Sequence, residues 1–190
     1  RRPLIAQRSA WAQRIEGLTR AHPNARVTWA AVRDGLAVSE RYAGCDIPLG
    51  DGDITQRWLG LVPIGANPVT GLYEFYHLRS ACDGDVAAAA QVEIPVHGAD
   101  GAIEVDEATG VVFVLLPGGR VTLGSQADDE SADFYDPDRQ PNESLHEVEL
   151  SPFLLARHEL TQGQWARLWA GGEAGREPSG YRAGMRADGR

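Results

Sequence analysis

The sequence predicts an α+β fold with many turns and few long elements. Its 190 residues include 22 glycines and 11 prolines, which favour turns and short strands over a helical bundle. Two stretches near the start have helical spacing, whereas the stretches after Trp58 are short and rich in β-forming residues. Hydrophobic residues make up 43% of the chain and charged residues 24%, which is the composition of a globular protein.

Residues 1–42 are predicted to form a helical linker. Between residues 3 and 20, apolar side chains recur at helical spacing and share one helix face. These side chains are Leu4, Trp11, Ile15 and Leu18. A second, short helix is expected after Thr28, a suitable N-cap. Its apolar face carries Trp29, Val32 and Leu36.

A β-hairpin is expected in the next segment, residues 43–110. Residues 59–64 and 72–78 are short runs of β-forming residues, and the turn-forming residues 65–71 lie between them. Residues 82–100 are rich in Ala, Asp and Gly, which indicates a connecting loop. A short extended piece is expected within it at residues 92–96.

The strand of residues 111–116 is apolar on both faces and is therefore predicted to be central in its sheet. Pro117-Gly118-Gly119 is expected to reverse the chain into a strand at residues 120–124. Residues 146–150 alternate in polarity, which predicts a half-buried strand. A further strand is expected at residues 153–158, after the interruption by Ser151-Pro152.

The clearest local signal is the start of a helix at Thr161. Thr161 and Gln164 have the spacing of a capping box, in which each side chain bonds to the other residue's main-chain N–H. The apolar residues Trp165, Leu168 and Trp169 then follow on one helical face.

The net charge of −9 is unevenly distributed. Residues 1–60 carry nine Arg and six acids, whereas residues 61–190 carry nine Arg and 21 acids. The acidic second part disfavours nucleic acids and anionic membrane surfaces as partners. No apolar run approaches the roughly 20 residues of a membrane span. The absence of Lys excludes a lysine Schiff base.

Local chemistry predicts no catalytic, cofactor-binding or metal-binding residue. Cys45 and Cys82 lack metal or redox spacing and are predicted to be unpaired thiols of a cytoplasmic protein, with a structural disulfide as the alternative. The acidic residues 128–138 lack the ligand pattern of an EF-hand and are interpreted as a surface loop. The pair His158-Glu159 is interpreted as structural, with proton transfer as the alternative.

One series of motifs resembles the opening of the formylglycine-generating, sulfatase-modifying enzyme domain. The blocks are residues 112–125, with the run Pro117-Gly118-Gly119, and residues 141–150, 153–165 and 177–181, in the family's order. The sequence departs from the usual family residues at Val121, Leu123, Leu145 and Glu177. Residues 60–78 are also similar to the region that precedes this domain in bacterial fusions with Ser/Thr protein kinases.

The resemblance implies an irregular fold like that of C-type lectins, of which residues 111–190 would be the first half. The family oxidises a cysteine of a protein or peptide substrate to formylglycine, with copper bound at a closely spaced cysteine pair. That pair lies in the half that this chain would lack, and Cys45 and Cys82 do not map onto it. The resemblance therefore transfers no catalytic residue and no cofactor site.

Three functions follow as hypotheses. The first is a fragment of a formylglycine-generating enzyme, inactive by itself and of marginal stability. The second is a non-catalytic binding or sensory module of a kinase fusion, because fold does not fix function. The third is a relative that forms C–S bonds with iron, as in ergothioneine biosynthesis; it would need a His cluster, and residues 1–40 contain only His22.

Overall fold

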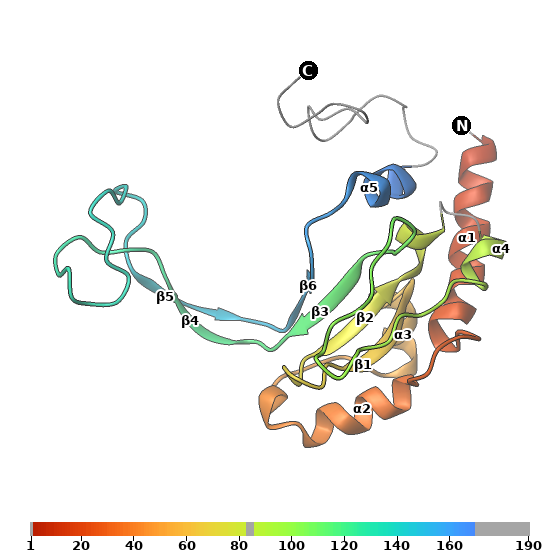
Figure 1. The fold of residues 1–190 in the computed structure, drawn as a ribbon, viewed down its shortest axis with the longest axis horizontal. Coiled ribbons are helices and arrows are strands. Elements are labelled where there is room, and N and C mark those ends of the chain that lie inside the picture. The colour runs from red at the N-terminus through yellow and green to blue at the C-terminus, as the bar shows by residue number, and fades with distance from the viewer. Residues whose placement is uncertain (1, 83–85, 170–190) are drawn as a thin grey trace.

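A computed structural model describes residues 2–82 and 86–169. Its centre is a four-stranded antiparallel sheet, and helices cover both faces (Figure 1). A second sheet of two strands projects away from this body (Figure 1). The predicted α+β class with small antiparallel sheets is therefore confirmed. None of the described helices is both long and apolar enough to cross a membrane.

The elements follow one another along the chain, with long connections between α4 and β3 and between β4 and β5. The α-helices are α1 (Arg2–Arg20), α2 (Trp29–Val38), α3 (Asp51–Arg57), α4 (Val86–Ala89) and α5 (Gln162–Trp169). The strands are β1 (Leu61–Ala66), β2 (Tyr73–His77), β3 (Val112–Leu116), β4 (Gly119–Leu123), β5 (His146–Leu150) and β6 (Phe153–Ala156). Two 3₁₀ turns complete them, η1 (Glu40–Tyr42) and η2 (Leu78–Ala81).

The two helices predicted at the N-terminus are confirmed. Ile15 of α1 is fully buried, and Trp11 and Leu18 pack beside it; the side chain of Leu4 lies outside the described residues. The Thr28 hydroxyl accepts a hydrogen bond from the Ala31 N–H at 3.1 Å and so caps α2 as expected. Helices α3 and α4 were not predicted, because they span only seven and four residues and have no helical stripe.

The predicted hairpin is formed by β1 and β2. Its turn is fixed by Asn67, whose side-chain oxygen accepts hydrogen bonds from the main-chain N–H groups of Val69 and Thr70. Gly71 has a φ of +69°, which glycine adopts at no steric cost. The returning strand pairs Leu61 with His77, with a shift of register between Pro63 and Gly65.

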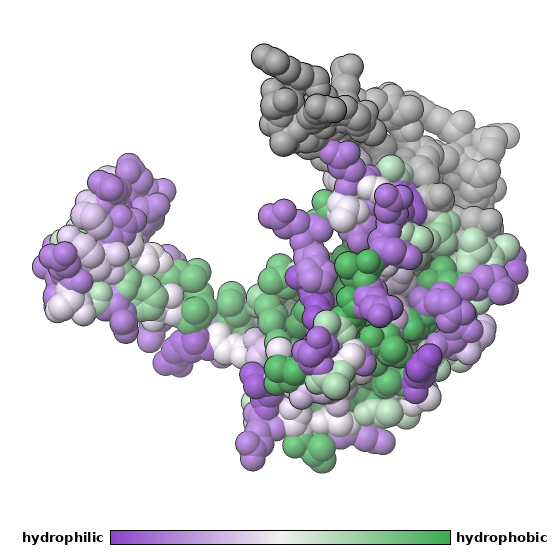
Figure 2. All heavy atoms as spheres, viewed as in Figure 1, coloured by the Kyte–Doolittle hydropathy of each residue, from purple (hydrophilic) through white to green (hydrophobic). Residues whose placement is uncertain are grey.

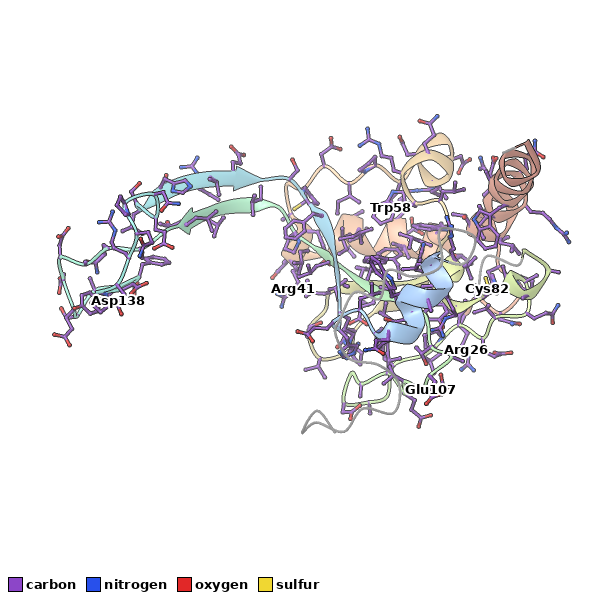
Figure 3. The ribbon with its side chains drawn as sticks, turned by 90° about the horizontal axis from the view of Figure 1, so that it is seen from above. Arg26, Arg41, Trp58, Cys82, Glu107 and Asp138 are labelled. Atoms are coloured by element: carbon purple, nitrogen blue, oxygen red, sulfur yellow. The ribbon has the colours of Figure 1, made fainter. Side chains whose placement is uncertain are left out.

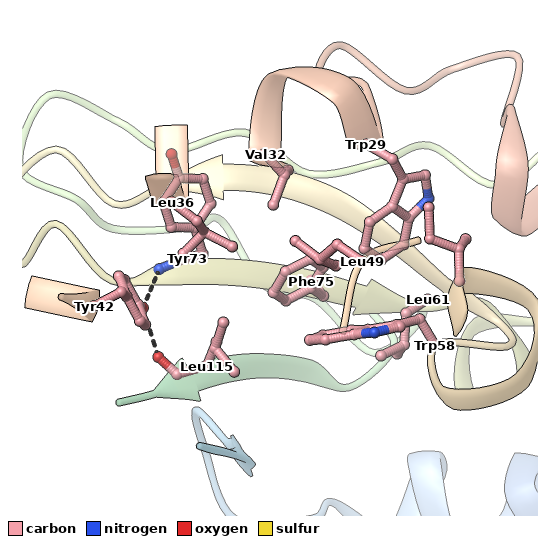
Figure 4. Close-up of a cluster of buried hydrophobic side chains, with 11 residues drawn as sticks. Trp29, Val32, Leu36, Tyr42, Leu49, Trp58, Leu61, Tyr73, Phe75 and Leu115 are labelled. Atoms are coloured by element: carbon pink, nitrogen blue, oxygen red, sulfur yellow. Dashed lines mark hydrogen bonds between the residues drawn. The ribbon is translucent and has the colours of Figure 1, made fainter. Parts of the chain in front are cut away.

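Each face of the main sheet carries its own apolar core, because neighbouring residues of a strand point to opposite sides. Phe75 of β2 is fully buried beneath α2 and α3, between the rings of Trp29 and Trp58 at centroid distances of 5.5 and 5.1 Å (Figure 4). Tyr76, the next residue, joins Ile15 of α1 in the second core. Because Val112 of β3 belongs to the same core, the sheet joins all three segments distinguished in the sequence.

A buried tyrosine bridges β2 and β3 at one end of the first core. The Tyr42 hydroxyl donates to the Leu115 carbonyl at 2.7 Å and accepts from the Tyr73 N–H at 3.0 Å (Figure 4). Burial raises the pKa of the Tyr42 hydroxyl above its ordinary value, so the hydroxyl remains protonated and keeps its donor. Tyr42 thus satisfies two main-chain groups that the ladder leaves open.

Strand β3 is central, as predicted, with β2 on one side and β6 on the other. The predicted reversal at Pro117-Gly118-Gly119 is wrong, however. The chain bends there and continues into β4, which pairs with β5, while β3 pairs with β6. The segment of β3 and β4 and the segment of β5 and β6 thus form one long two-stranded ribbon. Both segments bend at the same level, since Leu116 pairs with Phe153 and Gly119 with Leu150. A side chain at Gly118 would collide with the Leu150 carbonyl, so the close crossing requires glycine.

The strand of residues 146–150 exists, but the prediction that it is half buried is wrong. Only Val148 is partly buried, because β4 and β5 pack mainly against each other. The alternation of polarity in the sequence indicated a strand correctly. It did not reveal that the strand remains mostly exposed.

Helix α5 begins with the predicted capping box. The Thr161 N–H donates to the Gln164 side chain, and the Gln164 N–H donates to the Thr161 hydroxyl, both at 3.1 Å. The helix docks through Arg167, which donates to the carbonyls of Ser80, Glu107 and Thr109. The side chain of Trp169 lies outside the described residues.

We expect Thr161→Ala to destabilise the protein by about 1 kcal/mol, because the exposed cap loses its acceptor for the Gln164 N–H. Urea unfolding measures the change, and Thr161→Ser, which retains a hydroxyl, is the control. Equal losses in the two variants would contradict the capping role.

Candidate functional site

Residues 119–150, with β4, β5 and the loop between them, form an arm that extends far from the body (Figure 1). Asp138 lies at its tip, and Trp58 and Cys82 lie in the body (Figure 3). The arm carries nine acidic residues and two arginines. Ordering the main chain of such a projection costs much conformational entropy, which is not offset unless another surface packs against the projection.

Large apolar side chains on the arm are exposed. They are Val121, Leu123, Phe134, Tyr135, Leu145 and Leu150. Phe153 and Leu155 of the edge strand β6 continue this apolar surface onto the body, and Figure 2 shows apolar residues along the arm between its polar tip and the body. Contiguous apolar surface of this kind is typical of an interaction site.

The tip of the arm is organised by Gln126. Its side-chain oxygen accepts from the N–H groups of Asp128 and Asp129, and its side-chain nitrogen donates to the Asp129 carbonyl at 2.7 Å. Phe134, at a φ of +63°, is half exposed next to this turn. The tip is therefore an ordered loop that presents an aromatic ring to solvent.

The body contains a buried ionic cluster that we name the Glu74 cluster: Glu74, Asn67, His97 and Arg157. The Glu74 side chain is 4% exposed. Arg157 donates to its Oε2 atom at 2.6 Å, and His97 lies 3.1 Å from the same atom. Asn67 donates to Oε1 at 3.0 Å, so both carboxylate oxygens have partners.

The Glu74 cluster joins segments that are distant in the chain. Arg157 and Asn67 each donate a second hydrogen bond, at 2.9 Å, to the Gly101 carbonyl. Glu74 on β2 therefore holds together the hairpin turn, the loop at residue 101 and the end of β6. No sequence motif predicts this cluster, because its residues are distant from one another in the chain. The only sequence signal is a charged residue within the apolar strand of residues 72–78.

His77 is a second, partly buried ionisable group. Burial, assisted by the nearby Arg79 charge, lowers the pKa of His77 from 6.5 to about 4. Its ring meets Phe113 edge-on at 5.9 Å, and its buried Nδ1 atom makes no hydrogen bond. The imidazole is therefore neutral at neutral pH and acts as part of the packing.

The two cysteines are free thiols, as predicted. Cys82 is buried in the core beneath α1, where its thiol donates to the Leu78 carbonyl at 3.0 Å. Cys45 packs against the core on the other face of the sheet. Because the sheet separates them, the two thiols do not form a dithiolate, and they do not fit the copper site of the formylglycine-generating family. No copper chemistry is assigned to these residues.

The remaining candidates from the sequence do not assemble into a site. The acidic residues 128–138 are almost all exposed on the arm, as expected of a surface loop. His158 and Glu159 follow β6 at the surface. In the part of the chain that the structure describes, no three His, Cys, Asp or Glu side chains are grouped so that they could hold a metal ion. The block at residues 177–181 lies outside the described residues.

Comparisons of the chain with protein-family models, with curated proteins and with solved structures give no match. The features that bear on function are therefore the chain's own. They are an uncovered arm and a rigid body that the Glu74 cluster holds together.

Proposed function

We propose that this chain is the scaffold part of a formylglycine-generating, sulfatase-modifying type of domain with a C-type-lectin-like fold. One observation carries the proposal: the motifs that resemble this family coincide with the ribbon that bears the uncovered arm. Residues 112–125 span β3 and β4, residues 141–150 lead into β5, and residues 153–165 contain β6 and the start of α5.

In this proposal the apolar surface of the arm packs against a further part of the same domain, which carries the catalytic cysteines. The exposed side chains of Leu123, Leu145 and Leu150 would be buried there, and the edge of β6 would be covered. The chain described here positions that catalytic part and holds it rigidly. Its described residues supply no nucleophile and no ligand for copper in this proposal, and its two cysteines, of which only Cys82 is buried, are separated.

The first test is to sequence the gene beyond the codon for Arg190 and to express its complete product. We expect a closely spaced cysteine pair and, after loading with copper, oxidation of a cysteine-containing peptide to an aldehyde that a hydrazide probe detects. A stop codon directly after Arg190, or a complete domain without conversion of the peptide, would contradict the proposal.

The second test concerns the arm. Leu123 and Leu150 are 45% and 41% exposed in this chain. Leu123→Asp with Leu150→Asp should therefore change its unfolding free energy by less than about 1 kcal/mol. In the complete product the same double variant should lose conversion of the peptide and several degrees of thermal stability, because buried carboxylates would face apolar partners. Arg120→Asp, at a 72% exposed side chain on the same strand, is the control.

A non-catalytic binding module attached to a kinase is the second candidate. The ordered tip of the arm favours it, since Gln126 holds Phe134 in an exposed position beside acidic residues. A complete gene product that folds, contains a kinase domain and lacks the cysteine pair would support this candidate over the first.

A further inference from the structure

The chain between α4 and β3 forms a V across one face of the sheet (Figure 1). Residues 92–97 make the first leg, and residues 102–106 make the second. The turn between them is closed by a hydrogen bond from the Gly98 N–H to the Ala102 carbonyl at 2.8 Å. The Glu74 cluster holds this vertex, because Asn67 and Arg157 both donate to the Gly101 carbonyl.

A cavity of about 760 Å³ lies between the two legs. This volume falls within the range of ordinary ligand pockets. Tyr76 of β2, Ile94 of the first leg and Ile103 of the second supply apolar walls. All three side chains are buried in one core, so the walls are fixed in position.

The middle of each leg is main chain without hydrogen-bonded partners in the described chain. Among the described residues, no main-chain hydrogen bond is made by residues 93–97 or by residues 103–105. The two segments lie beside the cavity, and apart from Pro95, which has no N–H, their N–H and C=O groups make no main-chain hydrogen bond to a described residue. An extended polypeptide satisfies such groups by adding a strand.

The charge around the cavity is negative. Among the described residues, four carboxylates and no arginine line it; the carboxylates are those of Glu93, Asp100, Glu104 and Asp106. Hydrogen bonds from the Thr109 side chain and from main-chain N–H groups lower the pKa of Asp106, so this carboxylate stays charged at neutral pH. The Glu104 side chain is exposed, and no hydrogen bond or ion pair joins it to another described residue.

We propose that this V-shaped cleft binds an extended polypeptide segment that carries arginine or lysine side chains. The unpaired legs match an extended main chain, the apolar walls match its inward side chains, and the carboxylates match its positive charges. The cleft lies in the body, away from the arm, and the proposal does not depend on a formylglycine-generating function.

The test uses the 190-residue chain and fluorescence anisotropy with three probes. These are a labelled peptide of alternating arginine and valine, the corresponding peptide of glutamate and valine, and labelled arginine amide. We expect saturable binding of the basic peptide alone, with an affinity that falls as salt is raised. Equal binding of arginine amide would show a site for a small cation and would overturn the proposal for a polypeptide.

Paired variants locate the site. Glu93→Gln with Glu104→Gln should weaken binding of the basic peptide about tenfold, since two charges beside the cleft are lost. Glu147→Gln with Glu149→Gln makes the same change in net charge on the exposed β5 and should leave the affinity within about twofold. Circular dichroism checks that all variants keep the fold.

Two results would overturn the proposal. The first is the absence of saturable binding by the basic peptide at low salt. The second is a loss of affinity in the β5 pair that equals or exceeds the loss in the cleft pair, which would place the binding on the acidic arm.

Discussion

Replacing Glu74 by glutamine is expected to lower the free energy of unfolding by about 3 kcal/mol, because the Glu74 carboxylate is buried and its loss leaves the partly buried Arg157 guanidinium without its anion. The introduced glutamine also has only one acceptor oxygen, whereas the carboxylate has two and donors face both. The Asn67 side chain is held in orientation by Val69 and Thr70, so its NH₂ group must point at residue 74. A glutamine NH₂ group would face either that donor or Arg157.

Urea unfolding of the wild type and of Glu74→Gln measures the effect. Glu147→Gln is the matched control, because its ion pair with Arg120 spans 4.0 Å and both side chains are about 70% exposed. We expect the control to change stability by less than about 0.5 kcal/mol. A loss at Glu74 as small as that of the control would show that the cluster does not hold the body together.

Acidification from pH 6.5 to pH 4 is expected to remove about 3 kcal/mol of stability through His77 alone. The unfolded chain takes up a proton at its ordinary pKa near 6.5, whereas burial keeps the pKa of the folded imidazole at about 4. Stability from this group is therefore complete above pH 6.5. This contribution falls as the pH drops from 6.5 to 4 and stays level below pH 4.

His77→Phe isolates this contribution, since the ring fills similar space beside Phe113 and does not titrate. The difference in unfolding free energy between His77→Phe and the wild type should grow in favour of the variant as pH falls from 7.5 to 4. His146→Phe removes an exposed imidazole from the arm and controls for the unfolded chain. Parallel pH profiles of the wild type and His77→Phe would contradict the burial argument.

The features that the sequence predicted correctly depend on residues within a few positions of one another. The stripe on α1, the Thr28 cap of α2, the hairpin turn and the capping box at Thr161 all belong to this class. Each is decided by the periodicity of a helix or a strand, or by a side chain that bonds to main chain three residues away. Such local structures form whatever the tertiary surroundings of the segment.

The strand pairing after residue 116 depends on distant residues. The glycines and Pro117 indicated a change of direction, but a bend and a hairpin use the same residue types. The pairing of β3 with β6, and of β4 with β5, was decided by the competition of distant strands for the edges of one sheet. The exposure of β5 follows from that pairing and could not be predicted from its alternating sequence.

The candidate sites depend most on tertiary structure. Glu74 and Arg157 are 83 residues apart, and the carbonyl of Gly101 that completes their cluster lies in a loop without a motif. His77 stands in an ordinary β-forming run, and only the packing around it lowers its pKa. Local sequence thus set the elements and their caps. Burial and long-range contacts determine the charge states of ionisable groups and the position of clefts, because both depend on distant segments that together exclude water.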